Sequence, residues 1–287
     1  MMRWTTLVSA EDLAARLGQP GLVVVDCRQA LADPEAGEAA WARGHLPGAG
    51  HAHLERDLSL PGGPAAEGRH PMPTAARFSA LLGRLGIRPA DQVVAYDEET
   101  GAMAAARFWW LLRLFGHGRV AVLDGGIARW RALGLPVDTS KPEPAPAYPG
   151  AFDRSAFLSS EQVQARLGEA PGWLLDARPP ERFRGEVEPL DPVAGHIPGA
   201  LNRPVPANLS EGRFLPPDEL LRQFRKLLQG WDPEDVVLSC GSGVTACHNL
   251  LAMEHAGLHG ARIFPASWSG WVSDRSRPVE TGAASPG

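Results

Sequence analysis

One short segment, CGSGVTA at residues 240–246, places a cysteine before two glycines that are two positions apart. It follows an apolar run at 236–239, typical of a buried strand, and precedes a helix-like stretch at 247–255. Two glycines allow the backbone to curl so that several N–H groups point at one centre, and a helix N-terminus adds partial positive charge. A cysteine in such a loop is stabilised as a thiolate nucleophile without a histidine base. Cys240 is therefore the candidate catalytic residue.

The other cysteines have simpler interpretations. Cys247 lies inside the helix-like stretch and Cys27 lies between a strand and Arg28, so both are predicted to be structural. An odd count of three cysteines argues against a disulfide framework and favours a reducing compartment. Cytoplasm is the expected location.

The strand and helix predicted on either side of Cys240 belong to an internal duplication. Four pairs of segments match between the halves: SAEDLAARLG (9–18) with SSEQVQARLG (159–168), VVVDCR (23–28) with WLLDAR (173–178), GHLPGA (44–49) with GHIPGA (195–200), and DQVVAYD (91–97) with EDVVLSC (234–240). A serine N-cap and a glycine stop in the first pair predict a short helix in each half. The apolar runs in the second and fourth pairs predict buried parallel strands.

Strand and helix signals alternate within each half, which predicts an α/β fold of two homologous domains, 1–140 and 151–287. Each domain is expected to have a mainly parallel central sheet flanked by helices. The proline-rich segment 141–150 predicts a semi-rigid linker. Where the second half has Cys240, the first has Asp97, so the first domain is predicted to be catalytically silent.

Other duplicated polar residues are expected to serve the fold. His45 and His196 occupy matching places, which predicts a shared turn or buried hydrogen bond. Arg178 matches Arg28 and is predicted to pair with Asp176.

Composition excludes some classes of function. The 287 residues are 44% hydrophobic and 21% charged, as in globular proteins, and the formal net charge of −5 gives no reason to expect a nucleic-acid partner. No apolar stretch approaches the roughly 18 residues of a membrane span, and the N-terminus lacks the pattern of a signal peptide.

The whole set of motifs carries a resemblance to a known family. The loop at 240–246, the two GH(L/I)PGA segments, LDGGIARW (123–130), RFRGEVEPLDPVAGHIPGA (182–200) and the duplication make the chain similar to tandem rhodanese-type sulfurtransferases over nearly its whole length. The resemblance implies two rhodanese-like domains and a persulfide on Cys240. Sulfur would pass from 3-mercaptopyruvate or thiosulfate to cyanide, a dithiol or thioredoxin, with no metal or organic cofactor.

The resemblance also suggests which residues bind the donor. CGSGVTA is the loop of members that prefer 3-mercaptopyruvate, which implies substrate contacts from the loop residues Gly241, Ser242, Gly243, Val244 and Thr245. Two further places in the family's pattern hold arginines. Arg184 matches the first, and Leu190 stands at the second, so thiosulfate remains an alternative donor.

A histidine and an acid from the first half lie beside the loop serine in this family. His70 matches the histidine and Glu55 the acid, and the resemblance implies a proton relay to Ser242.

Two other classes of function remain open. Cysteine phosphatases also hold an anion between a strand and a helix, but their loop ends in arginine six residues after the cysteine, where this chain has Ala246. A non-catalytic sulfur-binding or regulatory module is the other alternative, and the presence of Cys240 argues against it.

Overall fold

The computed structural model describes residues 4–30 and 33–283. The chain divides into two compact units, and the division does not simply follow the chain. The first unit comprises Met1–Leu60, Pro73–Asp153 and Glu211–Phe214, and the second comprises Pro61–Met72, Arg154–Ser210 and Leu215–Gly287. The linker at 141–150 was expected to separate the domains. A division at this linker leaves two segments in the wrong unit, because 61–72 belongs to the second unit and 211–214 belongs to the first.

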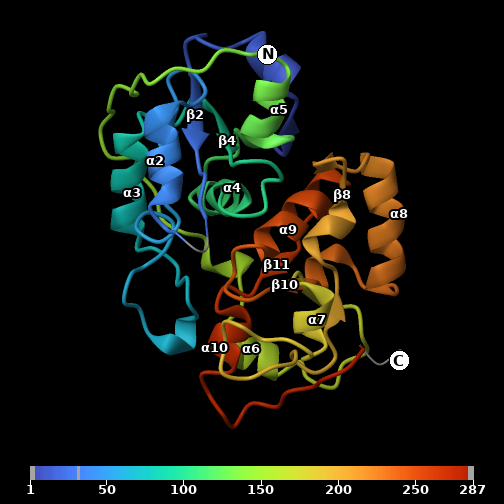
Figure 1. The fold of residues 1–287 in the computed structure, drawn as a ribbon. Helices are drawn as coiled ribbons and strands as arrows, with labels where there is room; N and C mark the ends of the chain where they lie inside the picture. Colours follow the sequence, from blue (N-terminus) through green and yellow to red (C-terminus); the bar gives the residue numbers. More distant parts are fainter. Residues whose placement is uncertain (1–3, 31–32, 284–287) are drawn as a thin grey trace. The chain divides into compact units, whose positions relative to one another are not determined.

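The first unit contains a parallel sheet of five strands in the order β1-β5-β4-β2-β3. Strands β2 and β4 of this sheet are labelled in Figure 1. The strands are β1 (Leu7–Val8), β2 (Leu22–Asp26), β3 (Gly50–His51), β4 (Gln92–Tyr96) and β5 (Val120–Leu123). Its helices are α1 (Ala10–Ala14), α2 (Ala36–Arg43), α3 (Ala75–Arg84), α4 (Ala105–Leu114) and α5 (Gly126–Ala132). Strand β9 (Arg213–Phe214) comes from the later segment of the chain.

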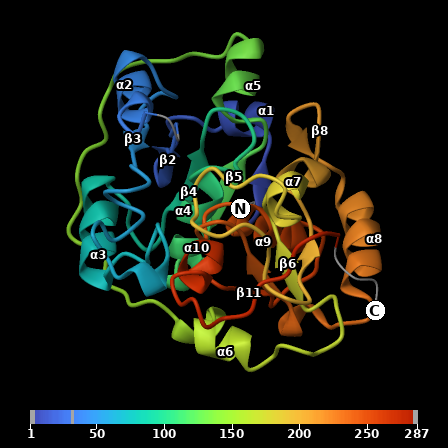
Figure 2. The same ribbon diagram turned by 60° about the horizontal axis from the view of Figure 1, so that its bottom comes forward.

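The second unit repeats this plan with four parallel strands in the order β11-β10-β6-β7. Strands β6 and β11 of this sheet are labelled in Figure 2. The strands are β6 (Leu174–Asp176), β7 (Leu201–Asn202), β10 (Val237–Ser239) and β11 (Arg262–Ile263). The helices are α6 (Ser160–Gln164), α7 (Pro180–Phe183), α8 (Pro217–Leu228), α9 (Ala246–His255) and α10 (Ser267–Trp271). Short elements complete the unit: η1 (Ala65–Glu67), η2 (Arg154–Ala156), η3 (Val205–Asn208), β8 (Leu209–Ser210) and η4 (Pro233–Asp235). The predicted α/β fold with mainly parallel sheets is confirmed.

The duplicated serine N-caps form as the sequence predicts. The Ser9 hydroxyl accepts a hydrogen bond from the Asp12 backbone N–H at 3.0 Å and begins α1. Ser159 begins α6 with a complete capping box, in which the Gln162 side chain accepts from the Ser159 N–H at 2.8 Å. Both helices are only five residues long, so tertiary packing must stabilise them.

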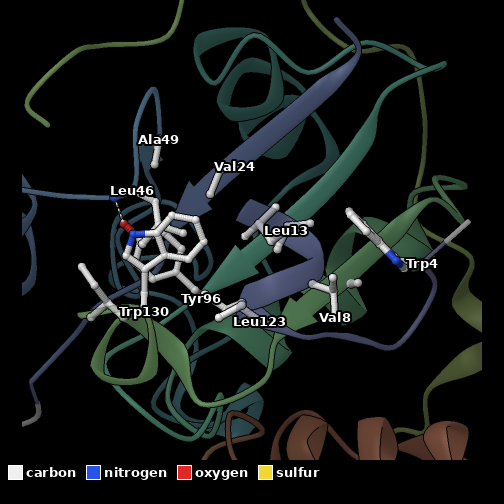
Figure 3. Packing of buried hydrophobic residues seen from close by; sticks show 13 residues of the cluster. Trp4, Val8, Leu13, Val24, Leu46, Ala49, Tyr96, Leu123 and Trp130 are labelled. Carbon is white, nitrogen blue, oxygen red and sulfur yellow. Dashed lines mark hydrogen bonds between the residues drawn. The ribbon is translucent and has the colours of Figure 1, made fainter. Parts of the chain in front are cut away.

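Each unit has its own hydrophobic core. In the first, Trp130, Leu13, Val24 and Tyr96 pack between the sheet and the helices that follow β1 and β5 (Figure 3). The dashed line in Figure 3 is the bond from the Leu46 N–H to the Tyr96 hydroxyl, at 3.2 Å. In the second unit, a core of the same kind is built from Trp173, Phe183, Trp268, Trp271 and the apolar strand residues around them.

The duplicated Asp-x-Arg sequence forms the same buried ion pair in both units. Arg28 Nη2 donates to Asp26 Oδ2 at 2.7 Å and to the Gly44 carbonyl at 2.8 Å. Arg178 Nη2 donates to Asp176 Oδ2 at 2.8 Å and to the Gly195 carbonyl at 2.7 Å. The predicted pairing of Arg178 with Asp176 is therefore confirmed. Each arginine joins the end of a strand to the GH(L/I)PGA turn.

The two matching histidines lie in these same turns. His45 forms an isolated antiparallel bridge with Asp138, and His196 forms one with Glu280. The His45 ring Nδ1 lies 2.8 Å from the Trp41 carbonyl, and the His196 Nδ1 lies 2.7 Å from the Phe183 carbonyl. Both rings are buried, so the predicted shared structural role is confirmed.

Within the described residues, none of the helices combines the length and apolar character needed to cross a membrane.

Candidate functional site

Cys240 follows β10 directly and lies in a loop whose backbone faces its sulfur. The Gly243 N–H donates to Cys240 Sγ at 3.1 Å. The Cys240 N–H donates to the Ser267 hydroxyl oxygen at 3.0 Å, and that oxygen lies 4.0 Å from the sulfur. The Gly243 N–H is therefore directed at the sulfur, and an N–H dipole favours negative charge there. That several loop N–H groups converge on Cys240 stays a prediction.

The chain around Cys240 is held closed by α10. The Trp268 N–H donates to the Cys240 carbonyl at 3.0 Å, and the Ser269 N–H donates to the Gly241 carbonyl at 2.9 Å. Gly243 adopts a φ of +74°, and a Cβ there would lie 2.3 Å from the Pro265 carbonyl oxygen. Only glycine fits this position, since both the backbone angle and the close approach exclude a side chain.

Two arginines lie beside the loop at Gly241. A Cβ on Gly241 would be 3.1 Å from Arg69 Nη2, 3.7 Å from Arg182 Nη1 and 3.8 Å from Arg182 Nη2. The carboxylate of Asp191 joins the two guanidinium groups: it pairs with Arg69 and lies 3.4 Å from Arg182 Nη2. Arg182 also pairs with Glu188 at 2.6 Å. The neutral loop is therefore flanked by cations from elsewhere in the second unit.

The segment 61–72 brings His70 to the loop. His70 Nδ1 lies 2.7 Å from Ser242 Oγ, a hydrogen bond between residues 172 positions apart. Gly68 fixes the segment against α10, because its φ is +82° and a Cβ there would lie 2.4 Å from the Ala266 carbonyl oxygen. The Arg69 N–H donates to Ser269 Oγ at 3.0 Å. In Figures 1 and 2 the cyan ribbon around η1 lies beside α10.

The guanidinium of Arg184 pairs with Glu186 at 2.7 Å, and its side chain is 37% exposed. In the same RFRG sequence, it is Arg182 whose guanidinium lies near Gly241. A contact of Arg184 with the donor stays a prediction. The two arginines are two residues apart at the end of α7, so they project from different sides of a helical turn.

The remaining predicted site residues have different surroundings. Leu190 is 53% exposed. Glu55 is also exposed and belongs to the first unit, where its N–H donates to His53 Nδ1 at 3.2 Å. Val244 is buried at the end of the loop, and Thr245 precedes α9 without a side-chain cap hydrogen bond.

Sequence reasoning did not assign a role to Arg69 or Arg182. Arg182 lies directly before Phe183 in the segment 182–200 that carries the family resemblance, and this position was a signal for a role at the site. Arg69 directly precedes His70, but a surface-loop arginine gives no signal by itself.

The first unit has the same loop closure around a carboxylate. The Ile127 N–H donates to the Asp97 carbonyl at 3.1 Å and the Ala128 N–H donates to the Glu98 carbonyl at 2.9 Å, as α10 does in the second unit. The Asp97 side chain accepts from the Gly101 N–H at 2.8 Å and the Met103 N–H at 3.2 Å. Burial raises the pKa of Asp97, although these N–H groups oppose the shift. An aspartate therefore occupies the place of the cysteine.

The other two cysteines are buried away from such an arrangement. Burial, followed by the carboxylates of Asp26, Asp97 and Asp57, raises the pKa of the Cys27 thiol well above its ordinary value. Cys247 is fully buried in α9, and its thiol donates to the Gly243 carbonyl at 3.4 Å.

Comparisons with known proteins identify the duplicated domain. The model of the rhodanese-like domain matches residues 9–133 and again 159–274. The chain is 48% identical over 279 residues to a "probable 3-mercaptopyruvate sulfurtransferase" of Pseudomonas aeruginosa, covering 96% of this chain and 98% of the other. It is 34% identical over 274 residues to the thiosulfate sulfurtransferase of Gallus gallus, with 92% of each chain covered.

A solved structure matches over most of the chain. The crystal structure of a 3-mercaptopyruvate sulfurtransferase from Escherichia coli matches with a TM-score of 0.78 and 32% identity, covering 92% of this chain and 99% of the other. Two matches to the domain model and relatives aligned over nearly the full length lead to one conclusion: this chain belongs to the rhodanese family of sulfurtransferases, with two rhodanese-like domains.

Proposed function

We propose that the protein moves a sulfane sulfur from 3-mercaptopyruvate to a thiol or cyanide acceptor through a persulfide on Cys240. The contact from the Gly243 N–H to Cys240 Sγ, at 3.1 Å, carries this proposal. It directs a backbone dipole at the sulfur of a cysteine that stands at the carboxyl end of β10.

Three free cysteines are consistent with a reducing compartment such as the cytoplasm, which we propose as the location.

The reaction divides into two transfers. The Cys240 thiolate attacks the donor sulfur, an S–S bond forms, and the C–S bond of 3-mercaptopyruvate breaks. The electron pair of that bond remains on carbon as the pyruvate enolate, which takes up a proton to give pyruvate. The acceptor thiolate or cyanide then attacks the outer sulfur of the persulfide and releases Cys240 as the thiolate.

The proton for the enolate is proposed to come through Ser242 and His70. Their 2.7 Å contact gives the serine hydroxyl a partner that can replace its proton. The first domain is proposed to be catalytically silent, because the Asp97 carboxylate cannot carry a sulfane sulfur.

The charges near the loop favour a donor with one negative charge. Three arginines, Arg69, Arg178 and Arg182, are paired with three carboxylates, Asp176, Glu188 and Asp191. The formal charges of this network cancel, and Gly241 and Ser242 add none. The dianion thiosulfate needs more cations than the monocarboxylate 3-mercaptopyruvate. Thiosulfate is therefore the second candidate donor.

A comparison of donors tests this proposal. With the same acceptor, we expect kcat/KM to be at least about tenfold higher for 3-mercaptopyruvate than for thiosulfate, a difference worth about one charge-assisted hydrogen bond. Mass spectrometry of the peptide containing Cys240 should show the gain of one sulfur atom after mixing with donor alone. A preference for thiosulfate would assign the alternative donor, and an unmodified Cys240 with both donors would exclude sulfur transfer.

Arg182 and Arg184 make a matched pair of variants. Arg182→Ala should raise the KM for 3-mercaptopyruvate about 10- to 100-fold, because it removes a charged hydrogen-bond donor beside the loop. Arg184→Ala should change this KM by less than about twofold, since an exposed ion pair with Glu186 is its described contact. Steady-state kinetics on both variants provide the measurement. Equal KM values for the two variants would contradict the placement of Arg182.

A further inference from the structure

Building on the proposed sulfur transfer, we propose that Arg69 is a donor-binding residue that supplies the second cation of the site and sets its specificity for anionic donors. The family pattern would place that cation at residue 190, where this chain has a leucine that is 53% exposed. Arg69 lies far from this position in the sequence but within the same compact unit.

The backbone of the 61–72 segment holds Arg69 in place. Gly68 lies so close to the Ala266 carbonyl oxygen that a Cβ would be 2.4 Å from it, and the next residue donates its N–H to Ser269 Oγ at 3.0 Å. A Cβ on Gly270 would in turn lie 2.8 Å from the Ala66 carbonyl oxygen. Because α10 also closes the loop around Cys240, the Arg69 backbone is fixed to the element that shapes the site.

The guanidinium of Arg69 is shared between an ion pair and the loop. Its Nη1 pairs with Asp191, while its Nη2 lies 3.1 Å from the place where a Cβ on Gly241 would be. An arginine offers several N–H donors in a planar fork, so one side can be held by a carboxylate while the other contacts a ligand. Arg182 approaches the same point at 3.7 Å and is bound to the same carboxylate.

Gly241 is the point of the loop that both arginines approach. A side chain at this position would contact Arg69, whereas its absence leaves both guanidinium groups facing the loop. In the proposed complex, the donor's anionic group binds both guanidinium groups next to the residue that follows Cys240, and the donor's sulfur faces the Cys240 thiolate.

Kinetics on the full-length protein test the proposal. The set comprises the wild type, Arg69→Ala, Arg69→Lys and Asp191→Asn, with Arg222→Ala as the control, because Arg222 forms an exposed ion pair with Glu219 on α8. Persulfide formation on Cys240 is measured against 3-mercaptopyruvate concentration, and turnover uses the neutral acceptor dithiothreitol. Arg69→Ala should raise the donor KM about 10- to 100-fold with kcat changed by less than about threefold. Arg69→Lys should give an intermediate KM, and Arg222→Ala the wild-type value.

Asp191→Asn distinguishes donor binding from a purely structural role. If Arg69 only anchors the 61–72 segment, Arg69→Ala and Asp191→Asn should have the same effect, because each breaks the ion pair between Arg69 and Asp191. In both variants kcat should then fall, because His70 would move away from Ser242. If Arg69 binds the donor, Asp191→Asn keeps the cation and should leave the donor KM unchanged or lower. Matching losses in the two variants would overturn the proposal.

A binding measurement separates this inference from the proposed function. On a Cys240→Ser background, which cannot form a persulfide, calorimetry should give a Kd for 3-mercaptopyruvate that rises about 10- to 100-fold with Arg69→Ala. Persulfide formation in the wild type with unchanged KM and Kd in Arg69→Ala would overturn the role of Arg69 alone. Failure of the wild type to form a persulfide with any donor would overturn the proposed function and this inference with it.

Discussion

Cys240→Ser is expected to lower sulfur transfer from either donor by at least about 1000-fold, to the uncatalysed rate. Serine fits the space of cysteine and keeps the Gly243 N–H contact at this position. Its hydroxyl is not ionised at neutral pH, and it forms no persulfide. The variant should therefore fold normally and lack the carrier of the reaction. The measurements are kcat/KM and the mass of the 240-containing peptide after mixing with donor.

The other two cysteines provide the controls for this variant. Cys27 and Cys247 are both fully buried, so Cys27→Ala and Cys247→Ala should keep the persulfide on Cys240 and turnover within about threefold of the wild type. Burial raises the pKa of the Cys27 thiol, which keeps it protonated and unreactive at neutral pH. Activity that survives Cys240→Ser, or a persulfide that appears on another cysteine, would refute the assignment of Cys240.

Arg28→Met should lower the free energy of unfolding of the first unit by about 3–5 kcal/mol. The reason is that Asp26 would remain buried without its cation: Arg28 donates to it from Nε at 2.9 Å and from Nη2 at 2.7 Å. Methionine preserves much of the apolar stem of arginine, so the loss reports mainly on the uncompensated charge and on the missing bond to the Gly44 carbonyl. Urea unfolding followed by circular dichroism provides the measurement.

The control for this prediction is an exposed ion pair in the same unit. Arg129 pairs with Glu11 at 2.7 Å, but the two side chains are 36% and 57% exposed. Arg129→Met should therefore cost less than about 1 kcal/mol. Similar losses for the two variants would show that burial does not determine the contribution of the Arg28 pair.

Much of the fold follows from repeated sequence patterns because these patterns describe local physics. Ser9 and Ser159 cap helices with contacts made within three residues, and the runs around Val24 and Val237 are apolar because parallel strands are buried on both faces. The duplication strengthens the prediction of each helix and strand, because the same signal occurs at matching places in both halves of the chain. Cys240 could be identified for the same reason, because its loop, strand and helix are contiguous.

The sequence could not place side chains that come together over long distances. Arg182 and Arg184 both belong to a basic motif, and only the turn of the chain after α7 determines which one faces Gly241. Arg69 reaches the loop because Gly68 packs against a carbonyl nearly 200 residues further along the chain. No pattern within 61–72 indicates this packing, so its assignment to the second unit had to come from the structure.

The exchange of segments between the two units constrains how the protein can be made. Ribosomes deliver the chain from its N-terminus, so 61–72 emerges long before the residues at 154–210 and 215–287 against which it packs. The first unit is likewise incomplete until 211–214 has been synthesised. Neither unit can therefore reach its final form during translation of its own half, unlike domains that fold as they appear. A nascent chain stalled at residue 153 would expose the 61–72 loop to proteases until the second half supplies its binding surface.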